Sequence, residues 1–444
     1  MHKINTFNWC LIIFYFFIWL SIDTYPENLL DFYNFYDNKK LFLSFRFLSP
    51  YLFFIIFLIF FKFIKFHTNH KAVNSVILII FLNYLIQTIS LVIFNFSINN
   101  LNYISLTFFS FLILINSYNI NLENKLFITS LYILSIVTVF YGSILLYWIF
   151  FKSTSLNLYG SFPHSLLIAR DFSNDLPRSS GISRSALILA IPTMIALIIQ
   201  KKRSIFFYFF YYFLTLLVLL TQSRIVTLFL FLFIPLIFYW ILINKEEHFI
   251  LKKIFLIIVM PILIWIISMM SKEYLQKIIE KEPNSISYKD KTYEKIIRTV
   301  DPKTITSGRF RDWNNIVKSN NNKIIGNGVM GDRYLINQTA SNLYLYNYAS
   351  GGIISVLFFS LIIFRAVFIS YKLLLFEKYP NRKNILSISS CLIILFLICR
   401  SLVENSFAVF GIDFLIFFTS YFYLEKNYFK SIGLLKNKFK IFKE

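Results

Sequence analysis

The chain has 444 residues, of which 57% are hydrophobic and only 15% are charged. A mean hydropathy of +0.64 excludes an ordinary soluble domain and a disordered chain. The net charge of +22 comes from 44 basic and 22 acidic residues, and the lysines stand mainly beside apolar runs. We therefore ascribe this charge to contacts with membrane lipids and predict no nucleic-acid partner.

Apolar runs long enough to cross about 30 Å of hydrocarbon recur along the chain. Because these runs are continuous and do not alternate with polar residues, they predict helices and not a β-barrel. We expect an all-α integral membrane protein, a polytopic helical bundle of about 12 transmembrane helices that forms a single membrane domain over residues 1–444. The predicted spans are 7–22, 47–66, 75–95, 101–117, 126–151, 184–200, 204–221, 224–243, 251–271, 344–370, 385–402 and 405–424.

Basic residues gather in alternate loops, such as Lys201–Arg203 and Lys372–Lys383, and in the tail after Lys426. By the positive-inside rule these loops are cytoplasmic, and so are both termini. Two polar stretches then face the other side of the membrane. They are an external loop at 152–183 and a large external loop at 272–343, between the ninth and tenth spans.

Arginines concentrate in these polar stretches and at the neighbouring helix starts. Arg170 and Arg178 precede the sixth span, Arg224 begins the eighth, and Arg309 lies in the string SGRFRDW. A guanidinium at the outer interface is a permanent cation whose planar donors suit phosphate oxygens. Several together would hold a pyrophosphate without a metal ion, whereas a single one can also reach toward lipid headgroups.

Two carboxylates are candidates for a catalytic base. Glu404 lies in the short turn between the last two spans, and Asp312 lies in the large loop. Glu404 has a structural alternative, an ion pair with Arg400 four residues earlier on one helical face. Asp413, inside the last span, is expected to pair with a polar neighbour. The sequence contains no metal-ligand spacing, P-loop or dinucleotide fingerprint, which predicts chemistry without a metal or cofactor.

Five short strings follow one another along the chain: RSSGISRSA, TQSR, SGRFRDW, GNG and SNLYLYNYASGG. In this order they resemble the O-antigen ligase and polymerase superfamily, bacterial membrane glycosyltransferases that use undecaprenyl-pyrophosphate-linked glycans. The resemblance covers about residues 175–420. It implies an enzyme of the bacterial inner (cytoplasmic) membrane that acts on lipid-linked oligosaccharide at the periplasmic face, with other polysaccharide assembly proteins as partners.

The resemblance implies roles for the arginines. By motif position, Arg178, Arg224 and Arg309 correspond to the residues that hold the pyrophosphate. Arg170 is a further candidate, because polymerase loops show an arginine with a glycine at a spacing that Arg170 and Gly181 fit. The glycines of the GNGVMG string themselves indicate turns.

Ligases of this superfamily carry His-Asn, nine further residues and Gly. Asn342 and Gly352 fit that spacing, but Ser341 stands at the histidine position. An alcohol cannot replace imidazole as a base near neutral pH, so the polymerase branch is favoured. Trp313, Ser341 and Asn342 are candidates for contacts with the glycan or its acceptor.

The favoured reaction is transfer of a glycan from undecaprenyl pyrophosphate to a sugar hydroxyl of a second lipid-linked repeat unit, an O-antigen polymerase activity. Two alternatives stay open. One is an O-antigen ligase that joins the polymer to lipid A–core. The other is a lipid-linked oligosaccharide flippase, for which we would expect broken helices, charges near the midplane and two similar halves.

Overall fold

The structure, a computed structural model, describes residues 71–96, 123–151, 180–199, 205–221, 223–243, 250–279, 309–336, 340–377, 384–404 and 411–441, together with residues 51, 55, 104, 105, 108, 111, 112 and 407. Every regular element within these ranges is a helix. Four helices are long and apolar enough to cross a membrane: Ser75–Phe94, Leu126–Tyr147, Gly181–Ile199 and Leu343–Leu375. The chain is therefore helical and of the membrane type, while the number of spans and their sidedness stay predictions.

The described helices include segments of nine predicted spans. They are α4 (Lys71–Phe94), α6 (Glu123–Phe151), α8 (Ser180–Ile199), α9 (Ile205–Leu220), α10 (Arg224–Ile243), α11 (Ile250–Ile254), the π-helical turn η2 (Phe255–Val259), α12 (Met260–Ile279), α14 (Arg309–Ser319), α15 (Gly331–Ile336), α16 (Leu343–Glu377), α17 (Ile385–Ser401) and α18 (Ile412–Ile441). Two of them, α14 and α15, lie within the polar loop predicted at 272–343. The predicted spans 7–22, 47–66 and 101–117 lie outside the described residues, apart from single positions.

Several helix ends differ from the prediction; among them, α16 continues to Glu377 beyond residue 370 and α18 to Ile441 beyond residue 424. The ninth span was expected to end at residue 271, but α12 continues to Ile279, because the string SKEYLQKII contains strong helix formers. The last span was expected from residue 405, but α18 begins at Ile412, directly after Gly411. Asp413 then stands in the first turn of α18, where a carboxylate favours helix formation.

The chain divides into two compact units, which we describe separately. In the unit that contains α8 to α12, α8 packs on α9 and α10, and α9 packs on α12. The hydroxyls of Tyr211 and Tyr212 in α9 donate to the carbonyl oxygens of Ile257 (3.1 Å) and Leu256 (2.9 Å) in η2. Since a π-helical turn disturbs the regular ladder of helix hydrogen bonds, these two tyrosines stabilise it from outside.

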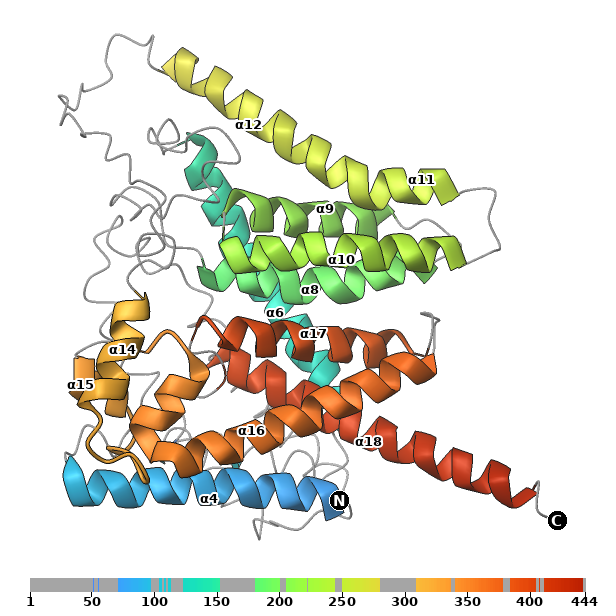
Figure 1. Ribbon diagram of the computed structural model, residues 1–444. Helices are drawn as coiled ribbons and strands as arrows, with labels where there is room; N and C mark the ends of the chain where they lie inside the picture. The colour runs from blue at the N-terminus through green and yellow to red at the C-terminus, as the bar shows by residue number, and fades with distance from the viewer. Residues whose placement is uncertain are drawn as a thin grey trace. The chain divides into compact units, whose positions relative to one another are not determined.

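The other unit contains α4, the start of α6, α14 from Arg311 onward, and α15 to α18. Here α16 packs on α4 and α17, and α17 packs on α18 (Figure 1). Every side chain of α18 from Ile412 to Glu425 is buried, so α18 forms the core of this unit. The ring of Phe407, just before α18, stacks on that of Phe417 with their centroids 4.0 Å apart. This core supports α4 and α16, the two helices whose ends contact the polar segment at residues 311–336.

α16 is broken near its start, although the sequence predicted a single uninterrupted span at 344–370. Gly351 and Gly352 have non-helical backbone angles, and Gly352 has φ 64° and ψ −159°. Such a conformation is accessible to glycine and costly for other residues. A Cβ atom on Gly352 would also lie 2.1 Å from the carbonyl oxygen of Ile324. The break exists because the turn before α15 packs directly against the backbone of α16.

Candidate functional site

The polar segment between α12 and α16, which carries three of the motif strings, is folded from Arg309 to Ile336. In it, α14 is followed by a turn at residues 320–330 and by α15. Figure 1 shows α14 and α15 near the C-terminal end of α4. The contacts agree, since a Cβ atom on Gly328 would lie 2.4 Å from the Cα of Leu91.

The turn at residues 320–330 forms hydrogen bonds with the backbone groups of α16 that have no intrahelical partner at the break. The amides of Asn327 and Gly328 donate to the carbonyls of Ala349 (2.8 Å) and Ser350 (2.9 Å), which end the first part of α16. The amide of Ile353, which starts the second part, donates to the carbonyl of Lys323 (2.9 Å). Both helix ends at the break are therefore capped by one stretch of backbone.

The glycine string GNGVMG forms a turn, as predicted, and not a phosphate cradle. Gly326 and Gly328 have φ of 69° and 91°. Their amides donate to the carbonyls of Asn322 (2.8 Å) and Ser350, and the amide of Gly331 donates to that of Gly328 (2.9 Å). Because these N–H groups are already bonded to the protein, they do not form an anion-binding concavity.

Three asparagines fix the shape of this turn. The side-chain Nδ2 of Asn327 donates to Oδ1 of Asn320 (3.0 Å), and Oδ1 of Asn327 accepts from Nδ2 of Asn322 (2.9 Å). The carbonyl of Asn327 accepts from the side chain of Asn95, at the end of α4 (2.9 Å). Asn320 in turn donates to the carbonyl of Tyr348 in α16 (3.0 Å). The turn is thereby tied to both helices, a role that the sequence did not reveal.

A buried polar contact joins α4 and α16 beneath the turn. The hydroxyl of Ser355 accepts from Nε2 of Gln87 (3.2 Å). It also lies within hydrogen-bonding distance of the side-chain oxygens Oδ1 of Asn83 and Asn347 (3.1 Å for Asn347). All four residues are buried. Amide and hydroxyl groups between apolar helices hold them together in lipid. The available sequence signal was the spacing of Asn83 and Gln87, four apart on one helical face.

Two of the residues predicted to contact the glycan lie together. The indole Nε1 of Trp313 in α14 donates to the hydroxyl of Ser341, just before α16 (3.0 Å). Asn342, by contrast, has a structural role. Its Oδ1 accepts from the amides of Tyr344 (2.8 Å) and Leu345 (3.2 Å) at the start of α16, and its Nδ2 donates to the carbonyl of Leu402 (2.7 Å).

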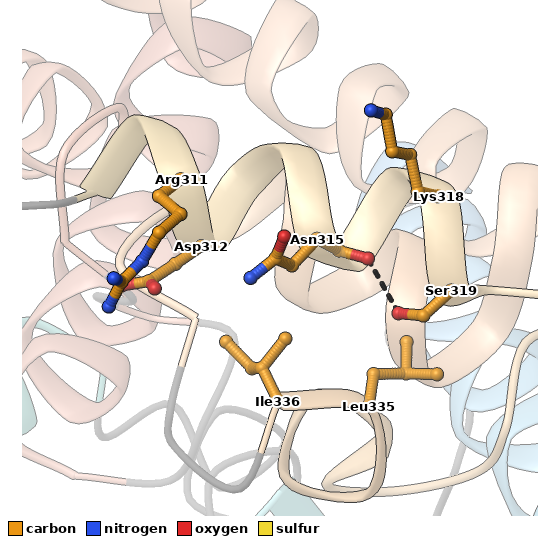
Figure 2. Close-up of a pocket in the computed structure, with 7 residues that line it drawn as sticks. All are labelled: Arg311, Asp312, Asn315, Lys318, Ser319, Leu335 and Ile336. Carbon is orange, nitrogen blue, oxygen red and sulfur yellow. Dashed lines mark hydrogen bonds between the residues drawn. The ribbon is translucent and has the colours of Figure 1, made fainter.

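An open pocket of about 690 Å³ lies between α14 and α15. It is lined by Arg311, Asp312, Asn315, Lys318, Ser319, Leu335 and Ile336 (Figure 2). The lining residues of α14 lie on its polar face, while Ile316, one helical turn after Asp312, is buried. Of the predicted site residues, Asp312 lines this pocket, and Arg309 does not. Arg311, Asn315, Lys318 and Ser319 were not predicted as site residues, although their helical spacing was a readable signal.

Asp332 holds the chain together between α15 and α16. It is fully buried, and its two carboxylate oxygens accept from the amides of Ala340 (2.6 Å) and Arg333 (3.0 Å). Burial raises the pKa of this carboxyl from 3.8 to about 6, against the opposing effect of those two hydrogen bonds and of the Arg333 charge.

Glu404 is engaged in an ion pair. Arg400, at the end of α17, contacts Glu404 through one guanidinium nitrogen and Asp413 of α18 through another. The predicted pair with Arg400 on one helical face is confirmed, and so is a polar partner for Asp413. Arg400 and Asp413 are buried, whereas the side chain of Glu404 is 29% exposed.

A second ion pair, between a partly exposed arginine and a buried glutamate, was missed by the sequence analysis. Arg365 of α16 donates through Nε (3.0 Å) and one Nη (3.2 Å) to the two carboxylate oxygens of Glu425 in α18, which also accepts from the hydroxyl of Tyr421 (2.5 Å). The available signal was Arg365 within the apolar run at 344–370, whereas Glu425 comes directly after the predicted span at 405–424. Because the pair joins α16 to α18 through two hydrogen bonds, we regard it as a link between the two helices.

The predicted pyrophosphate arginines are only partly described. Arg170 and Arg178 lie outside the described residues, and Arg224 begins α10 while its side chain lies outside them. Arg309 begins α14 and is partly exposed. Their convergence on one ligand stays a prediction.

Comparison with models of protein families, with curated proteins and with solved structures gave no match to this chain. The family resemblance therefore depends on the motif strings of the sequence alone.

Proposed function

We propose that this protein is a membrane glycosyltransferase of the O-antigen polymerase type, which extends a surface polysaccharide from lipid-linked repeat units. The observation that carries the proposal is that three of the strings that give the resemblance, SGRFRDW from Arg311 onward, GNG and SNLYLYNYASGG, pack together within one unit at the ends of apolar helices. The hydrogen bond from Trp313 to Ser341 joins the first string to the last. An ordered polar segment at the ends of apolar helices is a suitable place for a binding site.

The reaction needs no cofactor. The bond between the anomeric carbon of the donor sugar and the undecaprenyl pyrophosphate breaks, and a bond from that carbon to an acceptor hydroxyl oxygen forms. The proton of the hydroxyl passes to a carboxylate, for which Asp312 in the open pocket is our first candidate. Because pyrophosphate is already a good leaving group, catalysis consists mainly of positioning and of charge stabilisation. We assign the charge stabilisation to Arg178, Arg224 and Arg309, with Arg170 as a further candidate.

The ligase alternative is less well supported. A ligase of this superfamily would have an imidazole where this chain has Ser341, and the hydroxyl of Ser341 is bonded to Trp313. An indole N–H is a donor only and cannot take the proton of this hydroxyl, so Trp313 does not activate Ser341 as a nucleophile.

One observation favours the transporter alternative, namely the break in α16. In transporters, the free ends of such broken helices bind the substrate or the coupling ion. Here the amides and carbonyls at the break are bonded to residues 323–328. The break therefore serves to dock the polar segment, which supports an enzyme over a transporter.

Deletion of the gene, followed by gel analysis of the surface lipopolysaccharide, tests the proposal. A polymerase deletion leaves a single repeat unit on the core, and the native chain restores the ladder. Bare core with accumulated lipid-linked polymer would instead identify a ligase, and bare core with repeat units retained on the cytoplasmic side would identify a flippase. An unchanged glycan would refute all three.

A further inference from the structure

The polar side chains of residues 309–342 fall into two groups. Those that hold the segment together are bonded to other protein groups, as in Trp313, Asn320 and Asn327. The second group lies on the polar face of α14, around the pocket. Within the described part of the chain, no hydrogen bond or ion pair engages the side chains of the pocket residues Arg311, Asp312, Asn315 and Lys318. Arg311, Asn315 and Lys318 are exposed and Asp312 is half-buried, so these polar groups, gathered around one hollow, are free to bind a ligand.

The pocket combines three kinds of surface. Asp312 offers carboxylate oxygens that accept hydrogen bonds, and Arg311 and Asn315 offer donors. The half-buried side chains of Leu335 and Ile336 from α15 form an apolar wall. Figure 2 shows Arg311 and Asp312 side by side at one end, Asn315 between them and Ser319, and the two apolar residues opposite. Ser319 already donates to the carbonyl of Asn315 (2.5 Å) and so can only accept.

We propose that this pocket binds a sugar ring of the acceptor glycan, an inference that rests on the proposed function. A sugar ring presents hydroxyls at its edge and C–H groups on its faces. Its hydroxyls can donate to Asp312 while accepting from Arg311 and Asn315, and a ring face can lie on Leu335 and Ile336. A volume of about 690 Å³ lies in the range usual for small-molecule sites.

The charges of the pocket disfavour a phosphate group as its ligand. A phosphate is held by cationic donors, and a neighbouring carboxylate repels it. Here Asp312 stands beside Arg311, and the amino group of Lys318 points away from Leu335 and Ile336 (Figure 2). The pocket therefore suits the acceptor sugar, and the pyrophosphate of the donor requires a different set of cations.

The test uses purified full-length protein in a nonionic detergent and saturation-transfer NMR, which detects binding without turnover. The probe is the oligosaccharide repeat released by mild acid from the organism's own lipid carrier, and glycerol 1-phosphate stands for a lipid headgroup. We expect saturation transfer to the ring protons of the repeat, and at least a tenfold weaker affinity in Asn315→Ala and in Arg311→Gln. The matched control is Asn314→Ala, an exposed asparagine on the same helix that does not line the pocket.

Each result separates the pocket from the overall function. Equal affinity in the Asn315→Ala and Asn314→Ala variants would overturn the proposal, and so would tighter binding of glycerol 1-phosphate than of the repeat. If deletion abolishes the polysaccharide ladder but the repeat does not bind to the purified protein, the proposed sugar site is wrong and the proposed polymerase function stands. Specific binding through Asn315 in a protein whose deletion leaves the ladder intact would support a glycan site in a protein of another function.

Discussion

The indole of Trp313 donates a hydrogen bond to the hydroxyl of Ser341, and this bond joins α14 to the start of α16. The two residues are far apart in the sequence and belong to different motif strings. Ser341 also occupies the position where ligases of the superfamily that the sequence resembles have histidine. Its hydroxyl thus takes part in holding the polar segment together.

A double-mutant cycle tests this link. Trp313→Phe removes the donor, Ser341→Ala removes the acceptor, and each is expected to lower the free energy of unfolding by about 1 kcal/mol. Once either partner is gone the other substitution has less to remove, so the double variant should lose less than the two single losses together. Thermal unfolding in detergent measures all four proteins. Strict additivity would show that the bond contributes nothing to stability.

Asn327 is the residue on which the turn depends most. Its side chain bonds to both Asn320 and Asn322 and is almost fully buried. Asn327→Ala should cost about 1–3 kcal/mol of stability, since it leaves buried partners without their bonds. Asn321→Ala, an exposed change of the same kind in the same turn, should cost almost nothing. Equal unfolding temperatures for the two variants would contradict the assigned role.

The stability of the segment should depend on pH through Asp332. Because the pKa of this carboxyl is raised from 3.8 in the unfolded chain to about 6 in the folded protein, its contribution is fully present below pH 4. That contribution is lost as the pH rises from about 4 to 6, and it amounts to roughly 3 kcal/mol. The unfolding temperature of the wild type relative to Asp332→Asn should fall over this range and level off above it. A constant difference between the two proteins from pH 4 to pH 7.5 would argue against a buried carboxyl.

The sequence predicted those features that depend on local composition and spacing. Continuous apolar runs predicted the helices, and the spacing of Arg400 and Glu404 predicted their ion pair. Contacts between distant residues carry no such periodic signal. The capping of the α16 break by residues 323–328 depends on backbone groups, which every residue has, so only the Gly351–Gly352 pair marked its place. The sequence did not predict the pocket either, because its apolar wall comes from α15 and its polar residues come from α14.

The ion pair of Arg365 and Glu425 gives a further stability prediction. Arg365→Met leaves the buried carboxylate of Glu425 without its ionic partner and should destabilise the protein by about 3 kcal/mol, whereas Glu425→Gln leaves a partly exposed guanidinium and should cost less. The double variant removes both charges, so it should be more stable than at least one of the single variants. Unfolding in detergent, followed by tryptophan fluorescence, measures the three proteins. Additive losses would mean that the two charges do not stabilise each other.

The last prediction distinguishes the two candidate bases. Asp312 has no hydrogen bond or ion pair within the described residues and lines the pocket, whereas Glu404 is paired with Arg400. A carboxylate held by a guanidinium is less free to approach an acceptor hydroxyl, and a general base must lie within hydrogen-bonding reach of the proton that it takes. If the protein is a polymerase, Asp312→Asn should therefore lower the rate of polymer formation about a hundredfold or more, the usual contribution of a general base. Glu404→Gln should lower it much less, since Asp413 still pairs with Arg400. Complementation of the deletion strain, with the lipopolysaccharide ladder as the readout and protein amounts matched, compares them. Full activity of Asp312→Asn together with an inactive Glu404→Gln would reverse the assignment and make Glu404 the base.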